Sequence, residues 1–81
     1  MNALTLNKFN DLSDHEQYDL VFTEGQFIDY YLEDNRRFAL YALYVFFIEI
    51  EYDIKENKII GKISFNGGDR LNRYSDLSSI T

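Results

Sequence analysis

The chain has 81 residues, no cysteine, and a net charge of −6 from 14 acidic and 8 basic side chains. This length fits one domain, whose stability margin is thin because so small a domain buries only about 60 % of its unfolded surface. A negative chain gains nothing by releasing counterions from a phosphate backbone, which argues against nucleic acids and anionic membranes as partners.

The N-terminal residues 1–8 lack the basic segment followed by an apolar segment that marks a signal peptide, and we expect them to form a flexible N-terminus. The remainder, 9–81, contains no linker or internal repeat and is expected to form a single α+β domain. With no cysteine and no export signal, the sequence predicts a cytoplasmic protein.

The first regular element is predicted to be a helix that begins after Ser13. Ser13 and Glu16 have the spacing of a capping box, in which each side chain accepts from the other residue's backbone amide. Tyr18, Val21 and Phe22 then recur on one face, and Gly25 is a natural helix end.

A strand is expected over residues 27–32, followed by a polar loop. A three-residue loop places Leu32 opposite Phe38 and Glu33 opposite Arg37, an opposite-charge pair that favours this register. A two-residue loop would instead turn an acidic residue toward the buried face, so we favour the longer loop.

Eleven apolar residues run without interruption from Phe38 to Ile48. This run is too short for a transmembrane helix, which needs about 20 apolar residues. A buried helix is possible by length, but aromatic and β-branched residues crowd the second half, and every even position from Phe38 to Ile54 is apolar. The pattern predicts one long strand with a face that stays buried throughout.

A third strand is predicted over residues 59–65, with Ile54 opposite Ile59. The loop before it has four residues, and its Asn57 can tolerate a left-handed conformation. Asp69 is expected to cap a short helix after it; that helix carries Leu71, Tyr74 and Leu77. The predicted fold is a three-stranded antiparallel β-meander with a long central strand, flanked by an N-terminal and a short C-terminal helix (α-β-β-β-α).

The odd positions of the long strand predict an interaction surface. They are apolar before Glu49 and acidic from Glu49 onward, and one helix cannot easily cover both faces of a three-stranded sheet. Either the two helices divide the faces between them, or a second copy of the chain supplies the cover, and we favour the second copy. We therefore expect a homodimer, or another protein, to cover a face formed by four candidate interface residues: Tyr41, Leu43, Val45 and Phe47.

The sequence offers little for catalysis or for holding a cofactor. His15 is the only histidine and is expected on the wet face of the first helix. Acids two residues apart on a strand lie about 6.5–7 Å from each other, too far to share one metal ion without help. We expect no enzyme activity, no metal and no cofactor.

The chain from about residue 12 to residue 80 resembles a family of small uncharacterised bacterial proteins. The residues that carry the resemblance are Leu40-Tyr41, Phe46-Phe47, Glu49, Tyr52, Ile60, Ile63, Phe65 and Leu71 with Tyr74. The resemblance implies an independent domain with the α-β-β-β-α order, and it implies no activity.

Two functions remain open on these grounds. The first is a small non-enzymatic protein–protein interaction module that self-associates through its sheet. The alternative is an acidic inhibitor, immunity-type protein or nucleic-acid mimic that binds a basic partner surface. The alternative requires the strand acids to form one surface: Asp29, Glu33, Glu49, Glu51 and Asp53.

Overall fold

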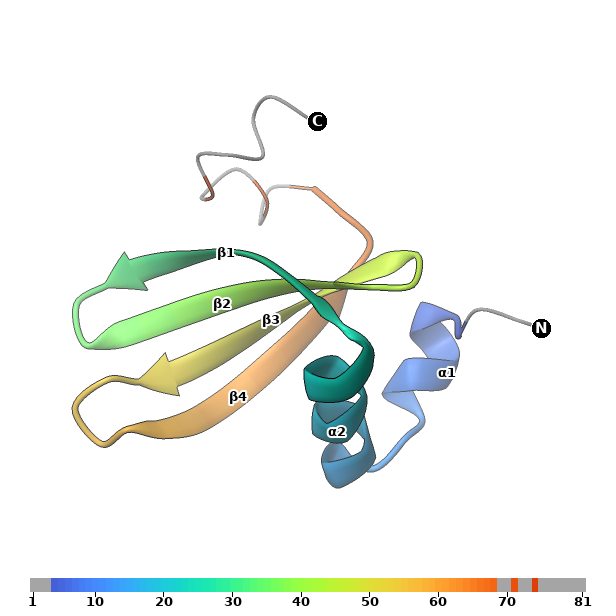
Figure 1. Ribbon diagram of the computed structural model, residues 1–81, viewed down its shortest axis with the longest axis horizontal. Coiled ribbons are helices and arrows are strands. Elements are labelled where there is room, and N and C mark those ends of the chain that lie inside the picture. Colours follow the sequence, from blue (N-terminus) through green and yellow to red (C-terminus); the bar gives the residue numbers. More distant parts are fainter. Residues whose placement is uncertain (1–3, 69–70, 72–73, 75–81) are drawn as a thin grey trace.

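The computed structural model describes residues 4–68 together with Leu71 and Tyr74. Two helices precede a four-stranded antiparallel sheet in which the strands follow one another in chain order (Figure 1). The α+β class with an antiparallel sheet is confirmed, but the expected number of three strands is wrong. The elements are α1 (Leu6–Asn10), α2 (Asp14–Glu24), β1 (Gln26–Glu33), β2 (Arg36–Leu43), β3 (Phe46–Asp53) and β4 (Lys58–Phe65).

Both helices begin at a side-chain cap. The hydroxyl of Thr5 accepts from the Lys8 amide at the start of α1, so this helix begins inside the segment that was expected to be flexible. The capping box of Ser13 and Glu16 at the start of α2 is confirmed. At the end of α2 a β-carbon on Gly25 would lie 2.5 Å from the Val21 carbonyl oxygen, so only glycine fits there.

The prediction of one long strand from Phe38 to Ile54 is wrong, because the chain reverses at Tyr44 and Val45. This two-residue turn separates β2 from β3, and the two strands then pair along their whole length. Tyr44 has a φ of 57°, a left-handed conformation that such tight hairpin turns usually assign to glycine or asparagine. The turn is hidden in the sequence because neither of its residues is a typical turn former.

The predicted loop of three residues between the first two strands is also wrong. The loop contains only Asp34 and Asn35, and Glu33 pairs with Arg36 rather than with Arg37. The two-residue loop was set aside because it directs Asp29 toward a buried face. Asp29 does lie opposite Leu40, but an irregularity next to it shifts the register and leaves the carboxylate half-buried.

The register between the last two strands differs from the prediction by two residues beside the loop, where Ile59 lies opposite Tyr52 rather than opposite Ile54. A second irregularity, between Glu51 and Tyr52, reduces the difference to one residue along the rest of the pair. Asn57 has a φ of 55°, which is the left-handed conformation that the sequence analysis expected this residue to tolerate. The loop over 54–57 keeps the predicted length of four residues, one position earlier in the chain.

Side chains on the two faces of the sheet form two separate apolar clusters. On one face, which we call the helix face, Phe9 of α1 and Val21 of α2 pack with Leu43, Phe46, Ile48 and Ile50. On the opposite face, which we call the acidic face, Leu71 and Tyr74 pack on Leu40. The C-terminal helix expected after Asp69, with Leu77, lies outside the described residues.

Substitutions at Tyr44 test the turn that divides the sheet. We expect Tyr44→Gly to be more stable than Tyr44→Val by at least about 1 kcal/mol, because a β-branched residue is strained at positive φ. Urea unfolding of both variants measures the difference. In a continuous strand the order would be reversed, since valine favours strands over glycine by up to about 1 kcal/mol.

Candidate functional site: an open apolar patch beside an acidic face

The four strands separate charge between the two faces of the sheet. Cross-strand partners share a face, so the row Asp29–Leu40–Glu49 and the row Glu33–Arg36–Asp53 both lie on the acidic face. Every acidic residue within β1 to β4 belongs to this face. The helix face of the same strands carries only two charged side chains, Arg37 and Lys62, and both are cations.

The five predicted acidic surface residues therefore share one face, but they are not equally available. The Arg36 guanidinium lies 3.1 Å from a Glu51 oxygen and 3.4 Å from an Asp53 oxygen, so it partly neutralises both. Glu33 is exposed and Asp29 is half-buried.

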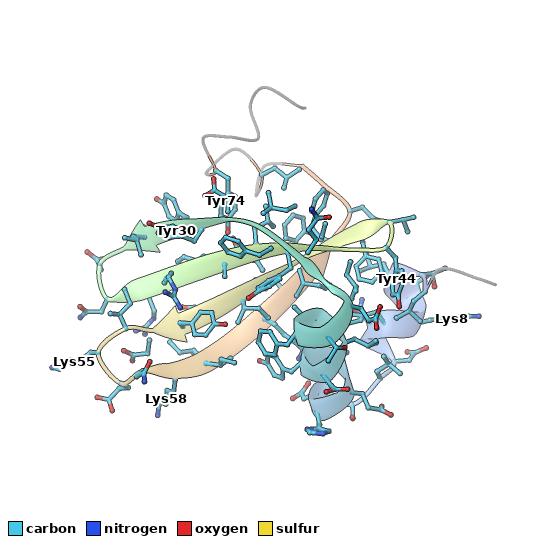
Figure 2. The ribbon with its side chains drawn as sticks, viewed as in Figure 1. Lys8, Tyr30, Tyr44, Lys55, Lys58 and Tyr74 are labelled. Carbon is cyan, nitrogen blue, oxygen red and sulfur yellow. The ribbon has the colours of Figure 1, made fainter. Side chains whose placement is uncertain are left out.

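Glu49 differs from the other four acids because it is buried, with 2 % of its surface exposed. The Tyr74 hydroxyl donates to its carboxylate at 2.6 Å, and the Tyr74 ring packs edge-on against Tyr31. Figure 2 shows Tyr74 beside the sheet, on the segment that follows β4. This contact holds Tyr74 on the acidic face and removes Glu49 from any surface that a partner would meet.

The four predicted interface residues do not form one face. Tyr41 and Leu43 lie on the helix face, where Leu43 is fully buried in the core. Val45 is at the tip of the turn with 70 % of its surface exposed, and Phe47 lies on the acidic face, stacked on Phe65. The expectation that they share a face is wrong, because the turn at Tyr44 reverses the strand between them.

A different set of apolar side chains is exposed on the helix face. The two helices cover the end of the sheet near the Tyr44 turn, and the strands extend beyond them toward the opposite end (Figure 1). Five large apolar residues in the uncovered part are between 37 and 55 % exposed. We call this set the open patch; its members are Phe27, Tyr30 and Leu32 on β1, and Ile59 and Ile60 on β4.

Side chains from the two middle strands connect the halves of the open patch. Leu32, Arg37, Tyr52 and Ile59 form one row across all four strands. Within this row the Arg37 guanidinium lies over the Tyr52 ring, 4.8 Å from its centre, so an aromatic face partly balances its charge. Arg37 and Tyr52 therefore connect the β1 half and the β4 half of the open patch across the middle of the sheet.

Aromatic rings mark the boundary between the open patch and α2. The Tyr41 ring packs edge-on against the rings of Phe22 in α2 and Phe27 in β1. The distances between ring centres are 5.9 Å and 5.7 Å, respectively. Burial raises the pKa of Tyr41 above its ordinary value of 10.0; the neighbouring Tyr52 raises it further, and Arg37 acts in the opposite direction. Tyr41 is thus a neutral, half-buried ring at this boundary.

Sequence reasoning missed the open patch because it assigned the exposed apolar face to the wrong strand. A signal was present in β1, where Phe27, Tyr30 and Leu32 accompany Ile28 and Tyr31, so both faces of this strand carry apolar residues. The irregularity beside Ile28 conceals the pattern, since it shifts the alternation by one residue.

The described residues offer no concave or metal-binding site. Within 4–68, Leu71 and Tyr74 there is no pocket, and no three histidine or acidic side chains gather closely enough for a metal ion. His15 lies exposed in the first turn of α2. Neither helix of the described part has the length and apolar character needed to cross a membrane.

Removing the Tyr74 hydroxyl tests the contact on the acidic face. We expect Tyr74→Phe to lower the free energy of unfolding by about 1–3 kcal/mol, because a buried carboxylate loses a donor. Tyr30→Phe is the matched control, since it removes a hydroxyl from an exposed ring and is expected to change stability by less than about 0.5 kcal/mol. Equal urea midpoints for the two variants would contradict the buried contact.

Comparisons of the chain with protein-family models, with curated proteins and with solved structures found no match. The geometry of the two faces is therefore the basis for the function proposed below.

Proposed function

We propose that this chain is a small non-enzymatic protein–protein interaction module that self-associates through its sheet. The observation that carries the proposal is the open patch, a set of exposed apolar side chains on β1 and β4 that the chain's own helices leave uncovered and that the Arg37–Tyr52 pair connects. A cytoplasmic location remains a prediction from the sequence.

The size of the open patch supports association with a protein. Five large side chains that are about half exposed present roughly 400 Å² of apolar surface, within the range of the largest patches on monomers, which are often functional. A specific interface buries about 800 Å² on each partner, of which about 60 % is apolar. The open patch and the polar residues around it together match this requirement.

Charge supports the same surface. The chain carries a net charge of −6, yet the open patch contains no charged residue, and the cation between its two halves, Arg37, lies over an aromatic ring. Interface centres are depleted in charged residues and enriched in aromatic residues and arginine. The open patch therefore has the composition of an interface centre, and the acidic face does not.

A lysine placed in the open patch is expected to weaken self-association. Tyr30→Lys should raise the dissociation constant of the dimer about 30-fold or more, because it puts a desolvated charge into the contact. Val45→Lys is the control, since it makes the same change of charge at an exposed apolar residue of the hairpin tip. Sedimentation of wild type and both variants across a hundredfold range of concentration measures the effect.

Two results of that sedimentation series would contradict the proposal. One is a wild-type protein that stays monomeric at every concentration. The other is equal weakening by the two lysines, which would mean that total charge, and not the open patch, governs association.

A second candidate function, binding to a basic protein surface, is favoured by the shared face of the five strand acids. Its support is reduced because Glu49 is buried and Arg36 neutralises part of the remaining charge. Glu33 and Asp29 are the acids on this face that are neither buried nor ion-paired with Arg36.

Poly-lysine is a suitable probe for this second function. Its affinity should fall about tenfold between low and high salt, and further with Asp29→Asn and Glu33→Gln combined. Asp19→Asn combined with Glu24→Gln on α2 is the control, because it removes the same charge from another surface. Two results would exclude a specific acidic surface: an affinity for poly-lysine that does not change with salt concentration, and an equal loss of affinity in both double variants.

A further inference from the structure

We propose that two copies of this chain associate face to face about a two-fold axis, with open patch against open patch and the two acidic faces outward. This inference rests on the self-association proposed above and adds the identity of the partner surface and its orientation. Four observations carry it: the apolar surface available, the separation of charge, the condition of the β1 edge, and the shape of the helix face.

Among the exposed surfaces of the described residues, the best apolar partner for the open patch is the open patch of a second copy. Elsewhere in the described part of the chain, the exposed large apolar residues outside the patch are spread over α2, the hairpin tip, the 54–57 loop and the acidic face. On the acidic face Ile63 is the exposed one, opposite Glu49, while Leu71 and Tyr74 already cover the apolar centre. Packing the patch on another surface would also leave a free patch on each assembly and build an open chain.

Charge separation favours the same arrangement. Joining the two helix faces keeps all five strand acids of each copy, including the buried Glu49, away from the interface. Joining two acidic faces would bring these carboxylates together in a chain that already carries −6, and like charges across an interface cost several kcal/mol.

The edge of β1 is poorly suited to pairing with a second β1. The irregularity beside Ile28 interrupts the strand, and such bulges blunt an edge. An edge-to-edge pair would also place Asp29 and Glu33 of both copies along one seam, and it would leave the open patch in water. Face-to-face contact avoids both costs.

The shape of the helix face allows two copies to interlock. A helix layer is about 10 Å thick, and two sheets pack about 10 Å apart. Since α1 and α2 cover only one end of the sheet, each copy has a step of this height, and the uncovered end of one sheet fits beside the helices of the other. Phe22, exposed on α2 next to Tyr41, lies at this step.

Single cysteines test the arrangement cleanly, because the chain contains none. We choose Tyr30→Cys on the helix face of β1, Arg37→Cys on the same face of β2, and Glu33→Cys on the acidic face of β1. In a face-to-face pair a short thiol crosslinker should join the first two variants at least tenfold faster than the third. In an edge-to-edge pair the two β2 strands are about 14 Å apart, so Arg37→Cys would not react.

The outcomes separate the arrangement from the proposed function. Crosslinking through both Tyr30→Cys and Arg37→Cys, with dimers only, supports the face-to-face pair. Two crosslinking results overturn the face-to-face arrangement: a dimer joined through Glu33→Cys, and a dimer joined through Tyr30→Cys but not through Arg37→Cys. Growth into larger open assemblies also overturns it. All three results leave the proposed self-association intact. A wild-type protein that is monomeric in the sedimentation series overturns both. Leu32→Cys repeats the Tyr30 test if that variant fails to fold.

Discussion

A two-residue turn inside the most apolar stretch of the chain is the constraint on which the other features depend. Tyr44 takes a positive φ there, and the chain returns along itself as β3. Because side chains alternate along a strand, the position of this turn decides which face each later residue joins. As a result, Phe46, Ile48 and Ile50 lie on the helix face and pack against α1 and α2, whereas Glu49 and its neighbouring acids lie on the acidic face.

The separated faces give the sheet two different surfaces. The helix face has a core under α1 and α2 and an uncovered apolar end, whereas the acidic face is closed at its centre by Leu71 and Tyr74. The Tyr74 hydroxyl makes this closure compatible with a buried carboxylate on Glu49. This small chain without disulfides thus has apolar clusters on both faces of one sheet. The open patch is the part of the helix face that α1 and α2 do not cover.

Local signals in the sequence predicted local structure well. The capping box at Ser13, the end of α2 at Gly25 and the left-handed Asn57 were all identified, because each depends on a few neighbouring residues. The fourth strand and both registers were missed, since a turn without turn residues and two strand irregularities are decided by tertiary packing. The burial of Glu49 could not be read from its neighbours, since its partner is 25 positions away.

The open patch exists only if β2 and β3 form a hairpin through the turn at Tyr44 and Val45. The presence of this hairpin is therefore the central claim. Nuclear Overhauser contacts between backbone protons of paired residues in these two strands test it most directly. The structure predicts contacts between Tyr41 and Ile48 and between Leu43 and Phe46. A spectrum with sequential strand contacts from Phe38 to Ile54 and no contact across these pairs would contradict it, and would return Tyr41, Leu43, Val45 and Phe47 to a single face.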